Sequence, residues 1–168
     1  MDYLAHRPRV EKIGEHGLFT DEGEPVVLGQ VQNQVADHKG IVWTHVISLR
    51  REDAARLGYD SAVQWMALLR SKRAMLCKHM KIDSANLKWY AAFHNESHHP
   101  HVHLLVYSVK DGEGYLTKQS IEAMRSELAH DIFRQDFANI YEEQAQSRMD
   151  LKERSEVVMK TWIDEIRA

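Results

Sequence analysis

The feature that most constrains the fold is a histidine-rich stretch in the middle of the chain, where five of the eleven histidines fall between His94 and His103. Residues 89–94 are aromatic and apolar, and residues 101–108 form a run rich in Val and Leu, so both are typical of strands. The polar residues between them predict a loop that ends at Pro100, which cannot donate a ladder hydrogen bond and therefore fits a strand start. The stretch predicts an antiparallel hairpin.

The hairpin would bring three of these histidines together. Side chains alternate along a strand, so His101 and His103 share one face. His94, at the end of the neighbouring strand, would lie beside them. Three imidazoles that converge on one point predict a metal site with open positions for water or substrate. A single histidine is more often an ordinary surface or core residue, and we interpret His98 and His99 as loop surface.

The same residues resemble a known motif. His101-Val-His103, preceded by Pro100 and by the upstream His94, resembles the third motif of plasmid relaxases, and within the HUH endonuclease superfamily it is most similar to MobP-type mobilisation relaxases. The resemblance runs from about residue 2 to residue 144. Three further segments are similar to that family: residues 42–49, 52–58 and 89–94.

The resemblance implies an enzyme that nicks and rejoins one DNA strand at a plasmid or conjugative transfer origin. Its substrate would be single-stranded DNA at that origin, and mobilisation accessory proteins would be its partners. It implies a divalent ion, with Mg or Mn preferred, while imidazole ligands also accept Zn, Ni and Co. Attack by a tyrosine would leave a 5′-phosphotyrosine and a free 3′-hydroxyl, and this covalent intermediate would allow rejoining.

The N-terminal residues carry the implied nucleophile. Residues 2–7, Asp-Tyr-Leu-Ala-His-Arg, resemble the N-terminal helix of MobP-type relaxases, so Tyr3 takes the place of the nucleophile. Spacing alone would favour a tyrosine without chemistry. The family has a strand before this helix, whereas this chain starts inside the helix that Pro8 would end. We therefore expect a fold that lacks the first strand, with Tyr3 displaced from the metal site unless DNA or a partner chain holds it.

Other readings stay open at this point. Glu96 is the carboxylate nearest to the histidines and would orient a ligand or assist with the tyrosine proton, or it is a solvated loop acid. A rolling-circle initiator or transposase-type HUH enzyme would instead use Tyr141 on a downstream helix. A third reading is a catalytically inactive, DNA-binding accessory module. His45, in the middle of a strand, is a core histidine or a functional one.

The pattern predicts an α+β fold: an antiparallel sheet from residues 41–49, 88–94 and 101–108, backed by helices near 61–80 and 118–141. The histidines would lie on the opposite face, partly covered by the Tyr3 helix, as in the palm of HUH relaxases. Residues 1–144 would form the nuclease domain and residues 145–168 a charged helical tail. The apolar face of the first backing helix would consist of Val63, Met66, Leu69, Met75 and Leu76.

Composition limits the class of partner. The net charge of −3 is unlike that of a protein that coats duplex DNA, but a nicking enzyme needs only a local cationic track. No apolar run is long enough for a membrane span, and the lone Cys77 excludes a disulfide framework and favours the cytoplasm. The oligomeric state stays open. The candidate DNA-binding cations are Arg7, Arg50, Arg70, Arg73 and Lys78.

Overall fold

The computed structural model describes residues 9–13 and 15–167 and divides the chain into two compact units, Met1–Arg125 and Ser126–Ala168. The predictions for the N-terminal helix, including those for Tyr3 and Arg7, lie outside the described residues. Among the helices of the described part, none combines the length and the apolar character that a membrane crossing requires.

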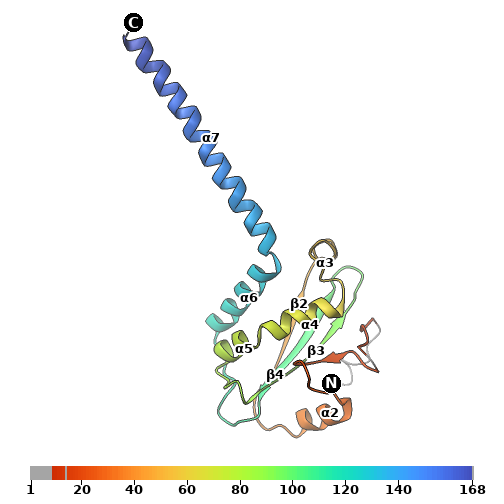
Figure 1. The fold of residues 1–168 in the computed structure, drawn as a ribbon. Helices are drawn as coiled ribbons and strands as arrows, with labels where there is room; N and C mark the ends of the chain where they lie inside the picture. The colour runs from red at the N-terminus through yellow and green to blue at the C-terminus, as the bar shows by residue number, and fades with distance from the viewer. Residues whose placement is uncertain (1–8, 14, 168) are drawn as a thin grey trace. The chain divides into compact units, whose positions relative to one another are not determined.

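The first unit is built on a four-stranded antiparallel sheet in the order β1-β3-β4-β2, with helices packed on it (Figure 1). This confirms the α+β prediction. The strands are β1 Leu18–Phe19, β2 Val42–Ser48, β3 Leu87–His94 and β4 His101–Ser108. The helices before β3 are α2 Leu28–Ala36, α3 Arg51–Leu57, α4 Ala62–Ser71 and α5 Arg73–Met80.

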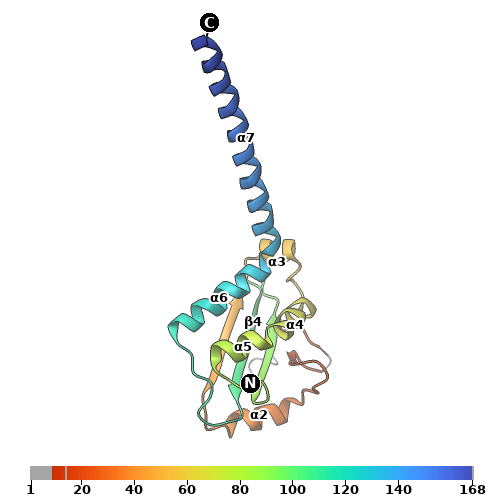
Figure 2. The same cartoon turned by 60° about the vertical axis from the view of Figure 1, so that its left-hand side comes forward.

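The two central strands form the predicted hairpin, paired in register from Leu87 opposite Ser108 to His94 opposite His101. One face of this hairpin packs under α4 and α5, which cross it in both ribbon views (Figures 1 and 2). Phe93 points to this face, and the Trp65 ring of α4 stacks on it at a centroid distance of 6.2 Å. Both rings are fully buried, so this layer is the main hydrophobic core.

The opposite face of the sheet is divided into two halves. Over one half, Val31 of α2 packs with Tyr90, Leu105 and Tyr107 in a second buried cluster. The other half holds the histidines. Next to it the side chains of the edge strand β2 are exposed, as Val46 shows with 58% of its surface accessible.

The cluster under α2 predicts an alkaline stability limit. Burial, with an added contribution from the adjacent Tyr90, raises the pKa of Tyr107 to about 12. The unfolded chain therefore loses the Tyr107 proton at lower pH than the folded chain does. The stabilisation is complete below about pH 10 and is lost as the pH rises towards 12, by roughly 2 to 3 kcal/mol. We expect Tyr107→Phe to flatten the fall of the urea-unfolding free energy over this range, whereas Tyr115→Phe, at an exposed tyrosine, should not. Equal slopes for both variants would contradict the assignment.

The predicted helix over residues 61–80 is interrupted. It splits into α4 and α5 at Lys72, whose backbone leaves helical geometry with φ −96° and ψ 6°. The prediction of Val63 on the apolar face is also wrong, because this side chain is 62% exposed. The buried positions Ala62, Trp65 and Leu69 recur at helical spacing, and Val63 lies about 100° away from that stripe.

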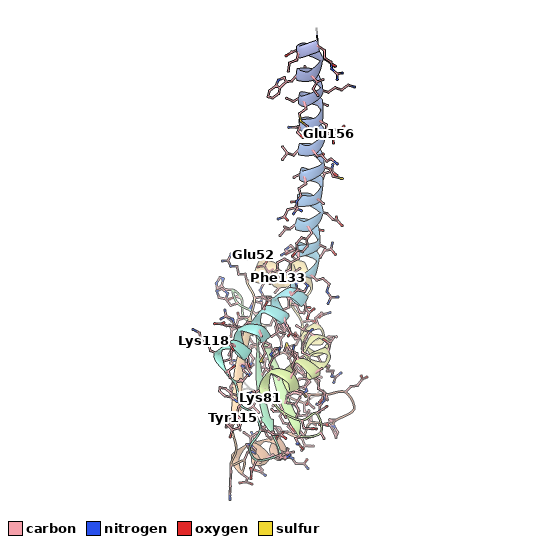
Figure 3. The ribbon with its side chains drawn as sticks, turned by 90° about the vertical axis from the view of Figure 1, so that its left-hand side faces the viewer. Glu52, Lys81, Tyr115, Lys118, Phe133 and Glu156 are labelled. Atoms are coloured by element: carbon pink, nitrogen blue, oxygen red, sulfur yellow. The ribbon has the colours of Figure 1, made fainter. Side chains whose placement is uncertain are left out.

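The helix predicted over residues 118–141 is likewise two helices, α6 Lys118–Ile132 and α7 Arg134–Arg167. The interruption at Phe133 is local, since the Phe133 amide donates to the Ala129 carbonyl at 2.9 Å and the Phe137 amide donates to the Phe133 carbonyl at 3.1 Å. No described residue of α7 is buried, and its side chains, including Glu156, project around the helix (Figure 3). The boundary at residue 144 stays a prediction.

The edge strand β1 is not predicted by the sequence pattern. Leu18 pairs with Ala92 and Phe19 with Ala91, which makes β1 the neighbour of β3. Two residues are too short a run to show the alternation by which strands are recognised, and the surrounding glycines favoured turns.

Candidate metal centre

The three histidines of the predicted triad meet at the loop end of the hairpin. His94 is the last residue of β3 and lies opposite His101, the first residue of β4, while His103 lies opposite Ala92. Directly paired residues of an antiparallel ladder point to the same face. The register therefore places all three imidazoles on the face opposite to α4 and α5.

The rings are close enough to share one ion. Their centroids lie 5.1 Å apart for His94 and His101, 4.8 Å for His94 and His103, and 5.0 Å for His101 and His103. One nitrogen from each ring can be chosen so that all three lie within 4.8 Å of one another. His94 is fully buried and the other two are half-buried, so the cluster is anchored in the sheet and accessible from one side.

The chemistry of the donor set fits a divalent cation. Nδ1 of His101 lies 2.9 Å from the His99 carbonyl oxygen. Because a carbonyl only accepts, this contact places the proton on Nδ1 and leaves the lone pair of Nε2 for a metal, which is how metal-binding histidines are usually oriented. An all-imidazole set suits Mn, Zn, Ni or Co better than Mg, which prefers oxygen ligands.

The loop that joins the three histidines is held by Arg51, the first residue of α3. Its Nε donates to the Ser97 carbonyl at 3.1 Å, and one terminal nitrogen donates to Asn95 Oδ1 at 2.7 Å and to the Glu96 carbonyl. Its backbone amide donates to the His98 carbonyl at 3.1 Å. No periodic pattern marks such a residue, because its partners lie on a distant loop.

The segment that follows the undescribed N-terminal residues runs beside His94. Val10 forms an isolated antiparallel bridge with His94, and the Asn95 amide donates to the Arg9 carbonyl at 2.9 Å. The Arg9 guanidinium also pairs with the Glu96 carboxylate at 2.5 Å. Glu96 is thus engaged by the N-terminal segment, and its role towards a ligand or a tyrosine proton stays a prediction.

The candidate DNA-binding cations fall into two groups. Arg50 is exposed and directly precedes α3. It follows two residues after Ser48, the β2 residue that pairs with His101. Arg70, Arg73 and Lys78 belong to α4 and α5 and thus to the other side of the sheet. The structure engages two of them internally, since Arg70 donates to the Thr20 carbonyl at 2.9 Å and Arg73 pairs with Asp21.

His45, the other histidine of the first unit that was left open as a candidate, does not join the triad. His45 pairs with Leu104, so it points to the helix-covered face, where it stacks on Trp43 at a centroid distance of 6.5 Å. Burial lowers the pKa of His45, as expected for a core histidine. Tyr141 belongs to α7 in the second unit and is 64% exposed.

Comparison with known proteins assigns the family. A search of curated proteins found no match, and neither did a search of solved structures. A family model for MobL relaxases matches residues 13–166, which contain the triad, α3, α6 and all but the last residue of α7. This match confirms the relaxase resemblance from residue 13 onward and extends it beyond residue 144, whereas the resemblance of residues 2–12, which include Tyr3, stays a prediction. The chain belongs to the MobL relaxase family.

Proposed function

We propose that the protein nicks and rejoins one DNA strand at the transfer origin of a plasmid or conjugative element, through a covalent 5′-phosphotyrosine and with a divalent metal ion. Membership of the relaxase family supports the general activity. The observation that carries the metal-dependent reading is the convergence of His94, His101 and His103 on one face of the hairpin.

The histidines would hold the ion, which supplies positive charge to the non-bridging oxygens of the scissile phosphate. Neutral imidazoles leave the full charge of the ion available to the substrate. His94 is fixed by complete burial and His101 by its contact with the His99 carbonyl, so the chain orders these rings before substrate arrives. We expect Mn, Zn, Ni or Co to bind more tightly than Mg, because all three donors are imidazole nitrogens and Mg prefers oxygen ligands.

Tyr3 would be the nucleophile. Its phenolic oxygen attacks the phosphorus, a bond from oxygen to phosphorus forms, and the bond to the 3′-oxygen breaks; the tyrosine gives up its proton and the leaving 3′-oxygen gains one. The support is the anchoring of Arg9 and Val10 beside His94. Five residues lie between Tyr3 and Arg9, and this stretch spans at most about 20 Å, so a tyrosine on this tether would be within reach of the triad. Glu96, tied to the same segment through Arg9, is our candidate for the group that handles the phenol proton.

Single-stranded DNA would bind along the exposed side of β2, next to the triad. Arg50 follows this strand, and Arg7 precedes the segment that lies beside His94, so both are proposed to contact phosphates. Arg70, Arg73 and Lys78 can take part only if the strand passes around the sheet to the face of α4 and α5. Mobilisation accessory proteins and a cytoplasmic location stay predictions.

The test is a nicking assay on a supercoiled plasmid that carries the transfer origin of the host element, with Mn²⁺ and with a chelator. The expected product is an open circle cut at one position of one strand, with protein linked to its 5′ end. A matched plasmid without the origin should stay supercoiled. Metal binding with no nicking at the cognate origin would instead favour the accessory, DNA-binding reading.

A further inference from the structure

We propose that Arg51 is a positioning residue that sets the spacing and orientation of the metal ligands by holding the loop between them. The inference rests on the metal site proposed above, but it concerns a residue that is not one of the proposed ligands. Arg51 contacts four successive loop residues, Asn95 to His98, through its guanidinium and its backbone amide.

The loop has few other anchors in the described part of the chain. The Asn95 side chain donates to the Asp60 carbonyl at 3.4 Å, a long hydrogen bond, and the Leu49 amide donates to the Pro100 carbonyl at 3.1 Å. At the opposite end the Asn95 amide donates to Arg9. Glu96 is also held by its ion pair with Arg9 and by its amide, which donates to the His94 carbonyl at 3.0 Å. The carbonyls of Ser97 and His98 are bound by Arg51, which is itself held in the first turn of α3 above the fully buried Ala54.

The position of the loop controls the orientation of one ligand. The His101 ring is turned by the His99 carbonyl, which directly follows the carbonyl of His98 that Arg51 binds. A shift of this peptide would rotate or release the His101 ring, while His94 would stay fixed by burial. Loss of such an outer partner of a metal ligand typically lowers metal affinity by about 10- to 100-fold.

The arrangement needs arginine rather than a generic cation. A guanidinium presents several donors in a rigid plane, so one side chain can serve the Ser97 carbonyl, the Glu96 carbonyl and Asn95 Oδ1 together. A lysine ammonium is a single point with three rotating donors and cannot span the same acceptors. The expected order of metal affinity is thus wild type, then Arg51→Lys, then Arg51→Met.

The experiment measures metal binding without DNA, by titrating the purified full chain with Co²⁺ and recording its visible absorption, and by calorimetry with Mn²⁺. Arg51→Met should bind roughly 10- to 100-fold more weakly and give an altered Co²⁺ spectrum, while Arg51→Lys should be intermediate. Arg56→Met is the matched control, because Arg56 belongs to the same helix but pairs with Asp53 at 3.0 Å, and it should bind as wild type does. Urea unfolding of the metal-free proteins shows that each variant is folded.

Two results would overturn the inference. One is an Arg51→Met protein with wild-type affinity and an unchanged Co²⁺ spectrum. The other, which also serves if Arg51→Met does not fold, is an Arg51→Lys protein that matches Arg56→Met in both readouts. If the three histidines are not a metal site at all, His103→Ala leaves Co²⁺ binding of the otherwise wild-type protein unchanged. This result distinguishes a failure of the proposed function from a failure of the Arg51 inference.

Discussion

Replacing His103 with alanine is expected to abolish metal-dependent nicking, with a loss of at least about 10³-fold in rate. The variant keeps two imidazoles, which hold an ion weakly, so the scissile phosphate loses the positive charge that stabilises its transition state. His103 is the best first choice because it is half-buried, whereas His94 is fully buried and its truncation also opens a cavity in the sheet.

The measurement is conversion of supercoiled origin plasmid to open circle, together with Co²⁺ titration and binding of a fluorescent origin oligonucleotide. His98→Ala is the control, since His98 is exposed on the same loop and its side chain is not part of the triad. Binding of single-stranded DNA should survive in the variant with alanine at His94, His101 and His103, because cationic side chains contact the backbone while the ion serves the chemistry. Should that variant lose DNA affinity as completely as it loses nicking, this division of roles is wrong.

Replacing Tyr3 with phenylalanine is expected to remove the covalent protein–DNA product entirely. Phenylalanine keeps the ring but lacks the oxygen that forms the bond to phosphorus, so no route to the 5′-phosphotyrosine remains. The loss should exceed about 10³-fold, while metal affinity and oligonucleotide binding stay close to wild type. Labelled origin oligonucleotide incubated with the protein and Mn²⁺, then resolved on a denaturing gel, reports the product directly.

Tyr141→Phe is the decisive partner variant, because Tyr141 is the nucleophile in the alternative, rolling-circle or transposase-type reading. It should form the adduct at the wild-type level. A product that persists in Tyr3→Phe but disappears in Tyr141→Phe would transfer the assignment to α7.

Arg9→Glu tests the role of the N-terminal segment that lies beside His94. Because it breaks the ion pair with Glu96, it should slow adduct formation with little effect on metal affinity. Arg9→Glu combined with Glu96→Arg should recover part of the rate.

The hairpin and its triad could be predicted from the sequence because the information is local. Strand alternation fixes which face His101 and His103 share, and the loop of six residues places His94 opposite His101 on that same face. The α+β class followed in the same way from periodicities of 2 and 3.6. The resemblance to relaxases rested on short motifs, each made of residues that are near neighbours in the chain, while Tyr3 as the nucleophile stays a prediction.

The tertiary structure decided everything that depends on a distant partner. Arg51 and Asn95 are 44 residues apart, and no pattern around either residue announces that they meet. The same holds for Arg70 and Arg73, two candidate DNA-binding cations whose contacts with Thr20 and Asp21 no sequence pattern announces. Likewise, only the pairing of β2 with β4 shows that His45 faces the helices instead of the triad. Backbone periodicity is set by neighbours in sequence, whereas the partner of a side chain is set by the packing of the whole sheet. This is why the sequence alone predicted the convergence of the three histidines but not the residues that contact the loop between them.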